Sequence, residues 1–363
     1  MKNFSTKAAL AICMLGLSIQ SFAGNKDRSG QAGATEMLIN PWAQSTGVFG
    51  QDVAYVSGIQ AMKDNIAGLA GVEKTDVGLS HVVYLTGTNV SINDLGIAEK
   101  VGNAGVIGVN VMSMGFGDIT VTDYNNPEGT GTYHPQFLNF ELGFSKEFSN
   151  SVRAGIAATF VSEQLTDIHA NGGAFEAGVQ YVTGKRDNFH FGITLRNIGT
   201  NMRFSGPGFS INGEANQSSS VGGYTMTQQT PVDNFQLPTY LNIGLSYDFY
   251  LDADHLKSAD DKPKHRLTIL GDFQSNSFNN DYLGGGLEYC FHDMFMIRGS
   301  YRFENGIGNP TTSTTIYTGF SVGATIQKQI GDKGPVFALD YSYRPTDRPA
   351  NGVHVISLRF MRR

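Results

Sequence analysis

Apolar and polar residues alternate in two consecutive stretches in the middle of the chain. Every second residue from Leu138 to Phe144 is apolar, and after a Ser-Asn-Ser turn the alternation resumes from Val152 to Phe160. A period of two places one apolar and one polar face on a β-strand. Each stretch, at roughly 9–11 residues, is long enough to cross a bilayer on a tilt. The stretch 136–161 therefore predicts a hairpin whose apolar face contacts either a protein core or lipid.

The same alternation recurs from residue 75 to the end of the chain. It predicts fourteen strands, at 77–87, 89–98, 102–115, 136–148, 151–164, 170–183, 188–198, 237–250, 264–276, 281–291, 294–303, 316–328, 334–344 and 352–361. An even number of strands is usual for single-chain bacterial outer-membrane barrels.

The connections between the predicted strands differ in length in a regular way. Those after even-numbered strands are mostly short, whereas those after odd-numbered strands include the long ones, at 116–135, 199–236 and 304–315. Outer-membrane barrels have this asymmetry, with tight periplasmic turns and longer external loops. We therefore predict an all-β fold, a transmembrane antiparallel β-barrel of about fourteen strands over residues 75–363. The apolar face of 136–161 is then expected to contact lipid.

Composition agrees with a membrane barrel and argues against other classes. Charged residues make up 16% of the chain, below the roughly 25% of soluble domains. Beyond the N-terminus there is no apolar run of the roughly 20 residues that a transmembrane helix needs. The formal net charge of −6 makes nucleic acid a poor candidate partner.

The first 23 residues have the pattern of a secretory signal peptide. Lys2 and Lys7 precede an apolar stretch from Ala8 to Ile19, and Ser21-Phe22-Ala23 is a small-x-small cleavage site. This predicts export, cleavage near Ala23 and localisation in the outer membrane. Without these residues only one cysteine, Cys290, is left, which excludes an internal disulfide.

Residues 24–74 differ from the rest of the chain. They contain the only tryptophan, Trp42, together with many small residues and short stretches that could form helices, but no long alternation. We interpret them as a compact segment that folds separately from the strands.

The sequence contains little that points to catalysis or metal binding. The eight histidines are scattered without a His-Glu-x-x-His motif, and there is no cysteine pair, so neither a zinc site nor another cofactor is expected. One Gly-x-Ser-x-Gly occurs at 319–323, but a nucleophile elbow needs a strand-to-helix turn and this match lies within a predicted strand. We therefore predict a protein that is not an enzyme. Glycines inside strands, such as Gly284–Gly286, are expected to permit curvature or the close approach of another backbone.

Several motifs, in order, resemble the PorV/PorQ family of Bacteroidetes outer-membrane proteins, a branch of the FadL-like barrels. The segment 65–70, Asn-Ile-Ala-Gly-Leu-Ala, is similar to the family's Asn-Pro-Ala-Gly-Leu-Ala, with Ile66 in place of the proline. Further similar stretches are distributed, in order, along nearly the whole chain beyond the signal peptide, at 33–39, 117–122, 127–131, 192–199, 237–239, 286–289, 297–302 and 339–343.

The resemblance implies a FadL-like barrel whose N-terminal segment, 24–74, plugs the lumen as a hatch. The hatch residues singled out are Trp42, Phe49, Asn65, Gly68 and Leu69. It also implies a non-enzymatic role in the type IX secretion system, in which the barrel binds or shuttles cargo proteins through their C-terminal signal domains. Expected partners are the large translocon barrel or attachment-complex subunits, together with outer-membrane lipid. The loop 201–236 is the candidate partner surface, with Phe209, Tyr224, Met226, Gln228 and Gln229.

An alternative function is that of a FadL-like transporter of hydrophobic small molecules. The residues expected to face the lumen are polar along much of its length: Asn139, Glu141, Arg153, Thr159, Thr194 and Arg196. A transporter would therefore need an apolar pocket in the hatch, for which the candidates are Trp42, Val48, Phe49, Ile59, Met62 and Leu69. A purely structural barrel is a third possibility.

Overall fold

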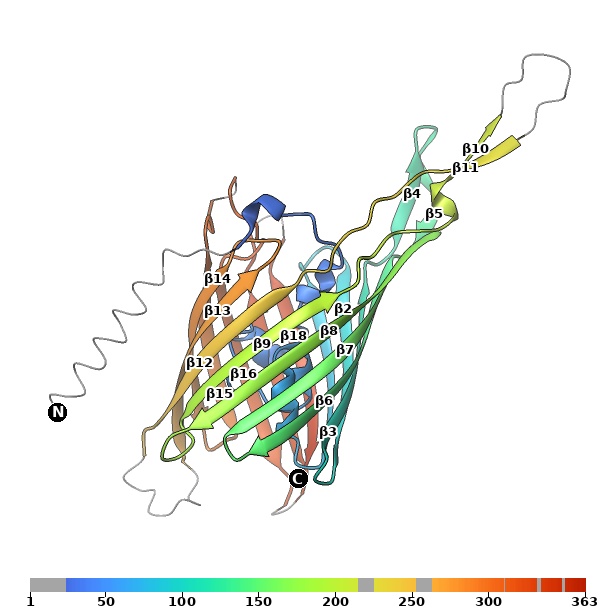
Figure 1. The fold of residues 1–363 in the computed structure, drawn as a ribbon. Helices are drawn as coiled ribbons and strands as arrows, with labels where there is room; N and C mark the ends of the chain where they lie inside the picture. The colour runs from blue at the N-terminus through green and yellow to red at the C-terminus, as the bar shows by residue number, and fades with distance from the viewer. Residues whose placement is uncertain (1–23, 215–224, 253–262, 310, 332–333, 348–349) are drawn as a thin grey trace, which may run out of the picture.

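The computed structural model describes residues 24–214, 225–252, 263–309, 311–331, 334–347 and 350–363. The expected signal peptide, 1–23, lies outside these residues. The described chain forms a closed antiparallel barrel of fourteen strands, with short helices inside it (Figure 1). No helix in the described ranges is long and apolar enough to cross a membrane.

All fourteen predicted strands are confirmed. They are β1 (Thr75–Tyr84), β2 (Val90–Val101), β3 (Gly105–Gly115), β6 (Gln136–Ser149), β7 (Val152–Leu165), β8 (Ile168–Thr183), β9 (Phe189–Gly199), β12 (Tyr240–Tyr250), β13 (His265–Asn276), β14 (Tyr282–Phe291), β15 (Phe295–Glu304), β16 (Phe320–Gln329), β17 (Val336–Arg344) and β18 (Val353–Arg362). Consecutive barrel strands pair, and β1 pairs with β18 to close the ring. The largest error in a predicted start is at β16, which begins at Phe320 and not at 316.

The two longest connections are not irregular loops, as the sequence predicted, but contain hairpins. One joins β4 (Ile119–Asp123) to β5 (Asn126–Tyr133), and the other joins β10 (Ser210–Glu214) to β11 (Thr225–Gln229). Both project beyond the rim of the barrel (Figure 1). The apolar alternation missed them because these strands cover no core and most of their described residues are exposed. We call this end of the barrel the long-loop end and the opposite one the short-turn end.

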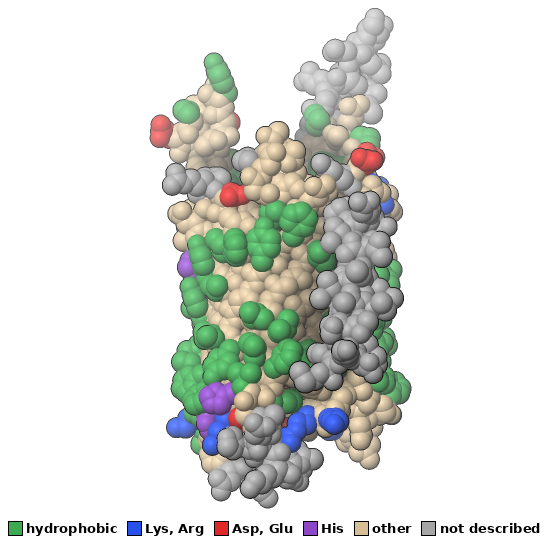
Figure 2. All heavy atoms as spheres, turned by 90° about the vertical axis from the view of Figure 1, so that its left-hand side faces the viewer, with side chains coloured by type: hydrophobic (Ala, Val, Ile, Leu, Met, Phe, Trp, Pro, Cys, Tyr) green, Lys and Arg blue, Asp and Glu red, His purple; other side chains and the backbone are tan. Residues whose placement is uncertain are grey.

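The predicted hairpin at 136–161 is confirmed as part of the wall. Phe144 pairs with Ile156 across β6 and β7, and both side chains point outward, with 39% and 63% of their surface exposed. The alternate residues point inward, and Glu141 is completely buried. On the face shown in Figure 2, patches of hydrophobic side chains lie along the outside of the wall, with lysine and arginine mainly toward the short-turn end. Burial of the polar row and exposure of the apolar row is the arrangement of a barrel in lipid.

The N-terminal residues run through the barrel from one end to the other. At the long-loop end the Gly24 nitrogen donates to the Asp281 carboxylate at 2.6 Å, and the chain then descends to begin β1 at the short-turn end. We call residues 34–72 the interior segment. After η2 (Lys26–Arg28) it contains η3 (Thr35–Leu38), α2 (Ala43–Thr46), η4 (Ile59–Lys63) and η5 (Ile66–Gly71). Helix α2 packs on β16–β18, η4 on β1–β3, and η5 on β3 and β6–β8.

Glycines on the inner face of the wall make room for the interior segment. A Cβ added at Gly108 would lie 2.7 Å from the Met62 sulfur, and one at Gly155 would lie 2.8 Å from the Ile66 carbonyl oxygen. Side chains essentially never approach so closely. The expectation that strand glycines admit another backbone is correct for Gly155 and Gly192, whereas at Gly284 and the others the close neighbour is a side chain of the interior segment. We call the whole set the glycine collar: Gly78, Gly96, Gly108, Gly143, Gly155, Gly178, Gly192, Gly244 and Gly284.

Candidate functional site

A cavity of about 440 Å³ lies at the long-loop end, above most of the interior segment. We call it the upper cavity. Part of its lining is apolar and part is aromatic and cationic, and Glu36, Lys63 and Asp64 also line it. The apolar part is formed by Met37, Ile39, Met114, Phe116 and Phe137, and the aromatic and cationic part by Phe49, Tyr84, Tyr240, Tyr282, Tyr317, Arg302 and Arg344.

Two arginines reach into the upper cavity and stack on aromatic rings. The Arg302 guanidinium, from β15, lies 4.0 Å from the centre of the Phe49 ring and 4.1 Å from that of Tyr282. The Arg344 guanidinium, from β17, lies 4.7 Å from the centre of the Tyr317 ring and 5.4 Å from that of Phe49. Such cation–π contacts hold a guanidinium by its faces and leave its N–H edge free for other partners.

Neither arginine has a carboxylate partner within 4.0 Å among the described residues. The ion pairs of the described chain all involve other residues. Arg344 is only 6% exposed, and its Nε and Nη2 atoms donate to no group in the described part of the chain. A buried cation without a partner is costly, because it loses its hydration and gains no compensating charge. The upper cavity therefore offers unused hydrogen-bond donors and positive charge.

The backbone at Phe49 places its ring between these groups. Phe49 has a φ of 60°, in the left-handed region that residues other than glycine rarely adopt. Its ring contacts Tyr317 edge to face, with centroids 5.3 Å apart. A strained backbone that orients an aromatic ring toward a cavity is the kind of outlier that marks functional sites. Phe49 was one of the predicted hatch residues, and it is the one that lines the cavity.

The other predicted hatch residues do not line the upper cavity but pack and form hydrogen bonds inside the barrel. Trp42 and Leu69 are completely buried in one hydrophobic cluster. Asn65 accepts from the Ala67 nitrogen at 3.1 Å and donates to carbonyl oxygens of Val53 at 2.9 Å and of the wall at 3.1 Å. The Gly68 carbonyl accepts from the Gly58 nitrogen at 3.2 Å, and a Cβ at Gly68 would collide with a neighbouring backbone.

The expected apolar pocket inside the hatch is wrong. Four of its six candidate residues, Trp42, Ile59, Met62 and Leu69, are completely buried and pack on one another and on the wall. Val48 is also completely buried, and only Phe49 lines the upper cavity. The glycine collar explains the difference. Because the collar positions have no side chain, the wall lies close against these side chains, and no space for a pocket is left between them.

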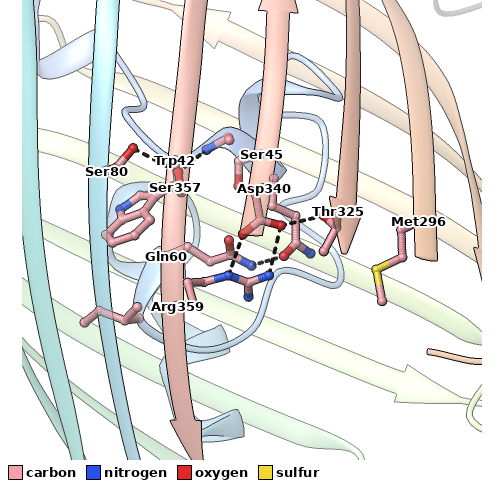
Figure 3. Close-up of polar contacts among 12 residues, drawn as sticks. Trp42, Ser45, Gln60, Ser80, Met296, Thr325, Asp340, Ser357 and Arg359 are labelled. Carbon is pink, nitrogen blue, oxygen red and sulfur yellow. Dashed lines mark hydrogen bonds and ion pairs between the residues drawn. The ribbon is translucent and has the colours of Figure 1, made fainter. Parts of the chain in front are cut away.

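Hydrogen bonds also tie the interior segment to the wall, as Figure 3 shows around Trp42 and Gln60. The Ala43 nitrogen donates to the Ser357 hydroxyl at 2.9 Å, and that hydroxyl lies 2.9 Å from Ser80. Beside them, Asp340 and Arg359 form an ion pair at 2.9 Å. Below, at the short-turn end, lies a second and more polar cavity of about 370 Å³.

The residues singled out in the loop 201–236 are not near the upper cavity. Phe209 ends η6 (Pro207–Phe209) and is half-buried. Met226, Gln228 and Gln229 belong to β11 in the projecting hairpin, where both glutamines are exposed. Tyr224 lies outside the described residues.

The Gly-x-Ser-x-Gly match has a structural role. Ser321 lies in β16 and faces inward, and its hydroxyl donates to the Gly47 carbonyl at 2.9 Å, just after α2. It therefore holds the interior segment and does not sit on a strand-to-helix turn. Within the described ranges, no three His, Cys, Asp or Glu side chains are grouped to hold a metal ion.

The fold is similar to solved outer-membrane channels. The Pseudomonas putida toluene transporter TodX matches with a TM-score of 0.53 and 10% identity over 89% of this chain and 97% of that chain. A TodX deltaS2S3 mutant, described as a monoaromatic hydrocarbon channel, matches with a TM-score of 0.53 and 12% identity over 88% and 97%. A Pseudomonas aeruginosa FadL homologue matches with a TM-score of 0.48 and 11% identity over 88% and 97%.

The two TodX matches establish that this chain has the barrel fold of that transporter. At this level of identity they establish the fold alone. No protein-family model matches the chain, and comparison with curated proteins gives no match. The resemblance to PorV/PorQ proteins thus gains no support from the comparisons.

Proposed function

We propose that this protein is an outer-membrane barrel that takes up hydrophobic molecules carrying an anionic group and binds them in the upper cavity. The observation that carries the proposal is the pair of arginines without carboxylate partners, Arg302 and Arg344, in a cavity that is also lined by apolar side chains. The fold, which is shared with a toluene transporter, supports the part of the proposal that concerns hydrophobic substrates. The long-loop end would then face the outside of the cell.

The cationic and the apolar parts of the lining suit the two parts of such a molecule. A carboxylate would receive charge-assisted hydrogen bonds from the guanidinium edges, which are planar and suited to bidentate contact. An apolar body would lie against Met114, Phe116 and Phe137. The volume of about 440 Å³ falls in the range of small-molecule sites, roughly 300–1,000 Å³.

We propose further that the interior segment acts as a hatch that separates the upper cavity from the short-turn end. The glycine collar, the buried cluster around Trp42 and the hydrogen bonds to Ser357 and Ser321 support this role. In this proposal residues 24–74 form the hatch and residues 75–363 the transporting wall.

Binding of two ligands with the same chain length tests the main proposal. Purified protein would be titrated calorimetrically with decanoate and with decanol, which differ in the anionic group. We expect decanoate to bind at least about tenfold more tightly, because a hydrogen bond to a charged group contributes roughly 1.5–3 kcal/mol. The double variant Arg302→Met, Arg344→Met should lose most of that preference and keep its affinity for decanol.

Arg203→Met is the matched control, because Arg203 is exposed at the long-loop end, outside the upper cavity. It should leave both affinities unchanged. Equal affinities of the wild-type protein for decanoate and decanol would contradict the anionic part of the proposal. The absence of binding by either ligand would contradict the whole.

A second candidate function is the binding of secreted proteins, as the resemblance to PorV/PorQ implies. The observation that favours it is the two projecting hairpins, each a two-stranded sheet whose strands pair only with each other among the described strands. Isolated two-stranded sheets are marginally stable, and free edges accept an added strand from a partner. Their exposed apolar side chains include Tyr124 and Ile211. The partner would be the C-terminal signal domain of type IX cargo, with the large translocon barrel or attachment-complex subunits.

Co-purification in mild detergent tests this second function. Wild-type protein should retain such cargo, and a variant without residues 206–229 should lose it while remaining a folded barrel. Unchanged cargo retention by the deletion variant would exclude the loop as the cargo site. A variant without residues 119–133 then tests the other hairpin, and cargo retention by both variants would contradict the role of the hairpins.

A further inference from the structure

A buried carboxylate lies in the turn between β13 and β14, at the long-loop end. Asp281 is only 2% exposed. Its Oδ1 atom accepts from the Asn276 nitrogen at 3.1 Å, and its Oδ2 atom accepts from the Gly24 nitrogen at 2.6 Å. Among the side chains that the structure describes, no lysine, arginine or histidine lies within 4.0 Å of it. A buried carboxylate without a cation is costly, so this position favours the arrival of a positive charge.

Arg28 lies beside the same turn but interacts with other groups. Its guanidinium lies 4.2 Å from the centre of the Phe278 ring, and its Nη2 atom donates to the Gln236 side-chain oxygen at 2.6 Å. The group that reaches Asp281 from the N-terminal part of the chain is therefore the nitrogen of Gly24 and not the Arg28 side chain.

The turn fits closely around Gly24. A Cβ added at this position would lie 2.6 Å from the Asp281 nitrogen and 2.9 Å from the Asn279 carbonyl oxygen, and both of these are backbone atoms. The distance of 2.6 Å from the Gly24 nitrogen to Asp281 Oδ2 is shorter than the roughly 2.9–3.0 Å of an ordinary N–H···O bond. Short distances of this kind are typical of charge-assisted hydrogen bonds.

Gly24 is also the residue that follows the expected cleavage site. In the uncleaved chain its nitrogen is an amide and carries no charge. Hydrolysis adds water across the Ala23–Gly24 bond, so that Ala23 leaves with the new carboxylate and Gly24 keeps a free amino group. That amino group takes up a proton and is mostly an ammonium group at neutral pH. Cleavage thus creates a positive charge at the atom that already contacts Asp281.

We propose that the α-ammonium group of Gly24, created by cleavage after Ala23, forms an ion pair with Asp281 and latches the new N-terminus to the β13–β14 turn. The placement of this latch gives it a role in the barrel. After Gly24 the chain is held again where the Gly33 nitrogen donates to the Gln236 carbonyl oxygen at 3.1 Å. The residues that follow, 35–40, line the upper cavity, as does Asn279 of the latched turn. The latch therefore fixes the entry of the chain that lines this cavity.

The identity of the N-terminal residue is the first test. The full chain would be produced in a bacterial host that exports it to the outer membrane, and the purified protein would be examined by intact mass and N-terminal sequencing. We expect the protein to begin at Gly24. A protein that begins at any other residue would overturn the proposal, because its ammonium group would not lie at Asp281.

The reactivity of the new amino group tests the ion pair. Purified protein would be treated with an amine-acylating reagent, and the rate of labelling at Gly24 would be followed by mass spectrometry, with exposed Lys100 as the internal reference. Asp281→Asn keeps the size of the side chain and removes its charge. We expect Gly24 to be labelled at least about tenfold faster in this variant, because a hydrogen bond between charged groups protects the amine in the wild type.

A second variant keeps Asp281 and moves the charge. Insertion of one glycine between Ala23 and Gly24 leaves the barrel unchanged and places the ammonium group one residue away from Asp281. Its terminal amine should be labelled as fast as that of Asp281→Asn, and it serves if the first variant does not fold. The matched control is Asp27→Asn, which removes an exposed carboxylate from η2 and should be labelled at the wild-type rate.

The ion pair is excluded if the terminal amine of the wild-type protein is labelled as fast as that of the folded Asp281→Asn and insertion variants. A slow rate in the wild type and in Asp27→Asn, with fast rates in the other two, supports it. Neither test uses a ligand, so a failure here is distinguishable from a failure of decanoate binding.

Discussion

Inward-facing arginines are paired with carboxylates in the middle of the barrel but not at its long-loop end. In the middle, Arg196 lies 2.6 Å from the Glu176 carboxylate and also donates to the carbonyl oxygens of Met62 and Asp64 in the interior segment. At the long-loop end, Arg302 and Arg344 lie on aromatic rings with no carboxylate within 4.0 Å in the described structure. The paired arginine contacts a carboxylate and two carbonyl oxygens of the fold, whereas Arg344 keeps buried Nε and Nη2 donors that a ligand can use.

The largest effect on stability is expected for the arginine that is paired with a carboxylate. Arg196→Met leaves the Glu176 carboxylate buried without a partner and removes two hydrogen bonds to the interior segment. Loss of one partner of a buried pair costs about 3–5 kcal/mol. The free energy of unfolding, measured by urea titration in lipid vesicles, should fall by that amount. A loss below about 1 kcal/mol would mean that the pair contributes no more than a surface pair.

A smaller loss is expected at the glycine collar. In Gly192→Ala the added Cβ meets the backbone around Val53, which cannot move like the end of a side chain, and overpacking costs about 1–3 kcal/mol. Gly285→Ala is the matched control, because a Cβ there has no contact closer than 3.6 Å. The same urea titration should separate the two variants, and equal stabilities would show that the interior segment adjusts freely.

The smallest effect on stability is expected in the upper cavity. Arg344→Met removes a buried cation that has no carboxylate partner, so it strands no opposite charge, and Met can cover the same aromatic surface. The free energy of unfolding should fall by less than about 1 kcal/mol, or should rise. A loss as large as that of Arg196→Met would show that Arg344 is a structural residue and would weaken the proposed site.

The wall was predictable because its pattern is local. Alternation such as that from Leu138 to Phe144 arises from a fixed two-residue period and a lipid phase outside the barrel, and it requires no knowledge of neighbouring strands. The same reasoning failed for the β4–β5 and β10–β11 hairpins, whose strands are mostly exposed and carry no apolar period. It also placed an apolar pocket around Trp42, where the structure has a packed cluster.

Part of the candidate site was visible in the sequence, and the rest was not. Phe49 was singled out within the N-terminal segment, but nothing near it in the chain indicated Arg302 or Arg344. Only the folded chain brings α2 beside β16 and β17 and so places the Phe49 ring against both guanidiniums. A possible signal was the presence of arginine at inward-facing positions near the long-loop ends of two strands.

By itself, the sequence determined the number of wall strands, the face of each that contacts lipid and the presence of a distinct N-terminal segment, because these depend on periodicity and composition along the chain. The tertiary structure alone decided which buried charges are paired. The partner of Arg196 is 20 residues away in the chain, and Lys63 pairs with Glu141 only because the interior segment passes β6. Charges are paired by distance in space, and in this barrel that distance depends on how the interior segment fits against the glycine collar.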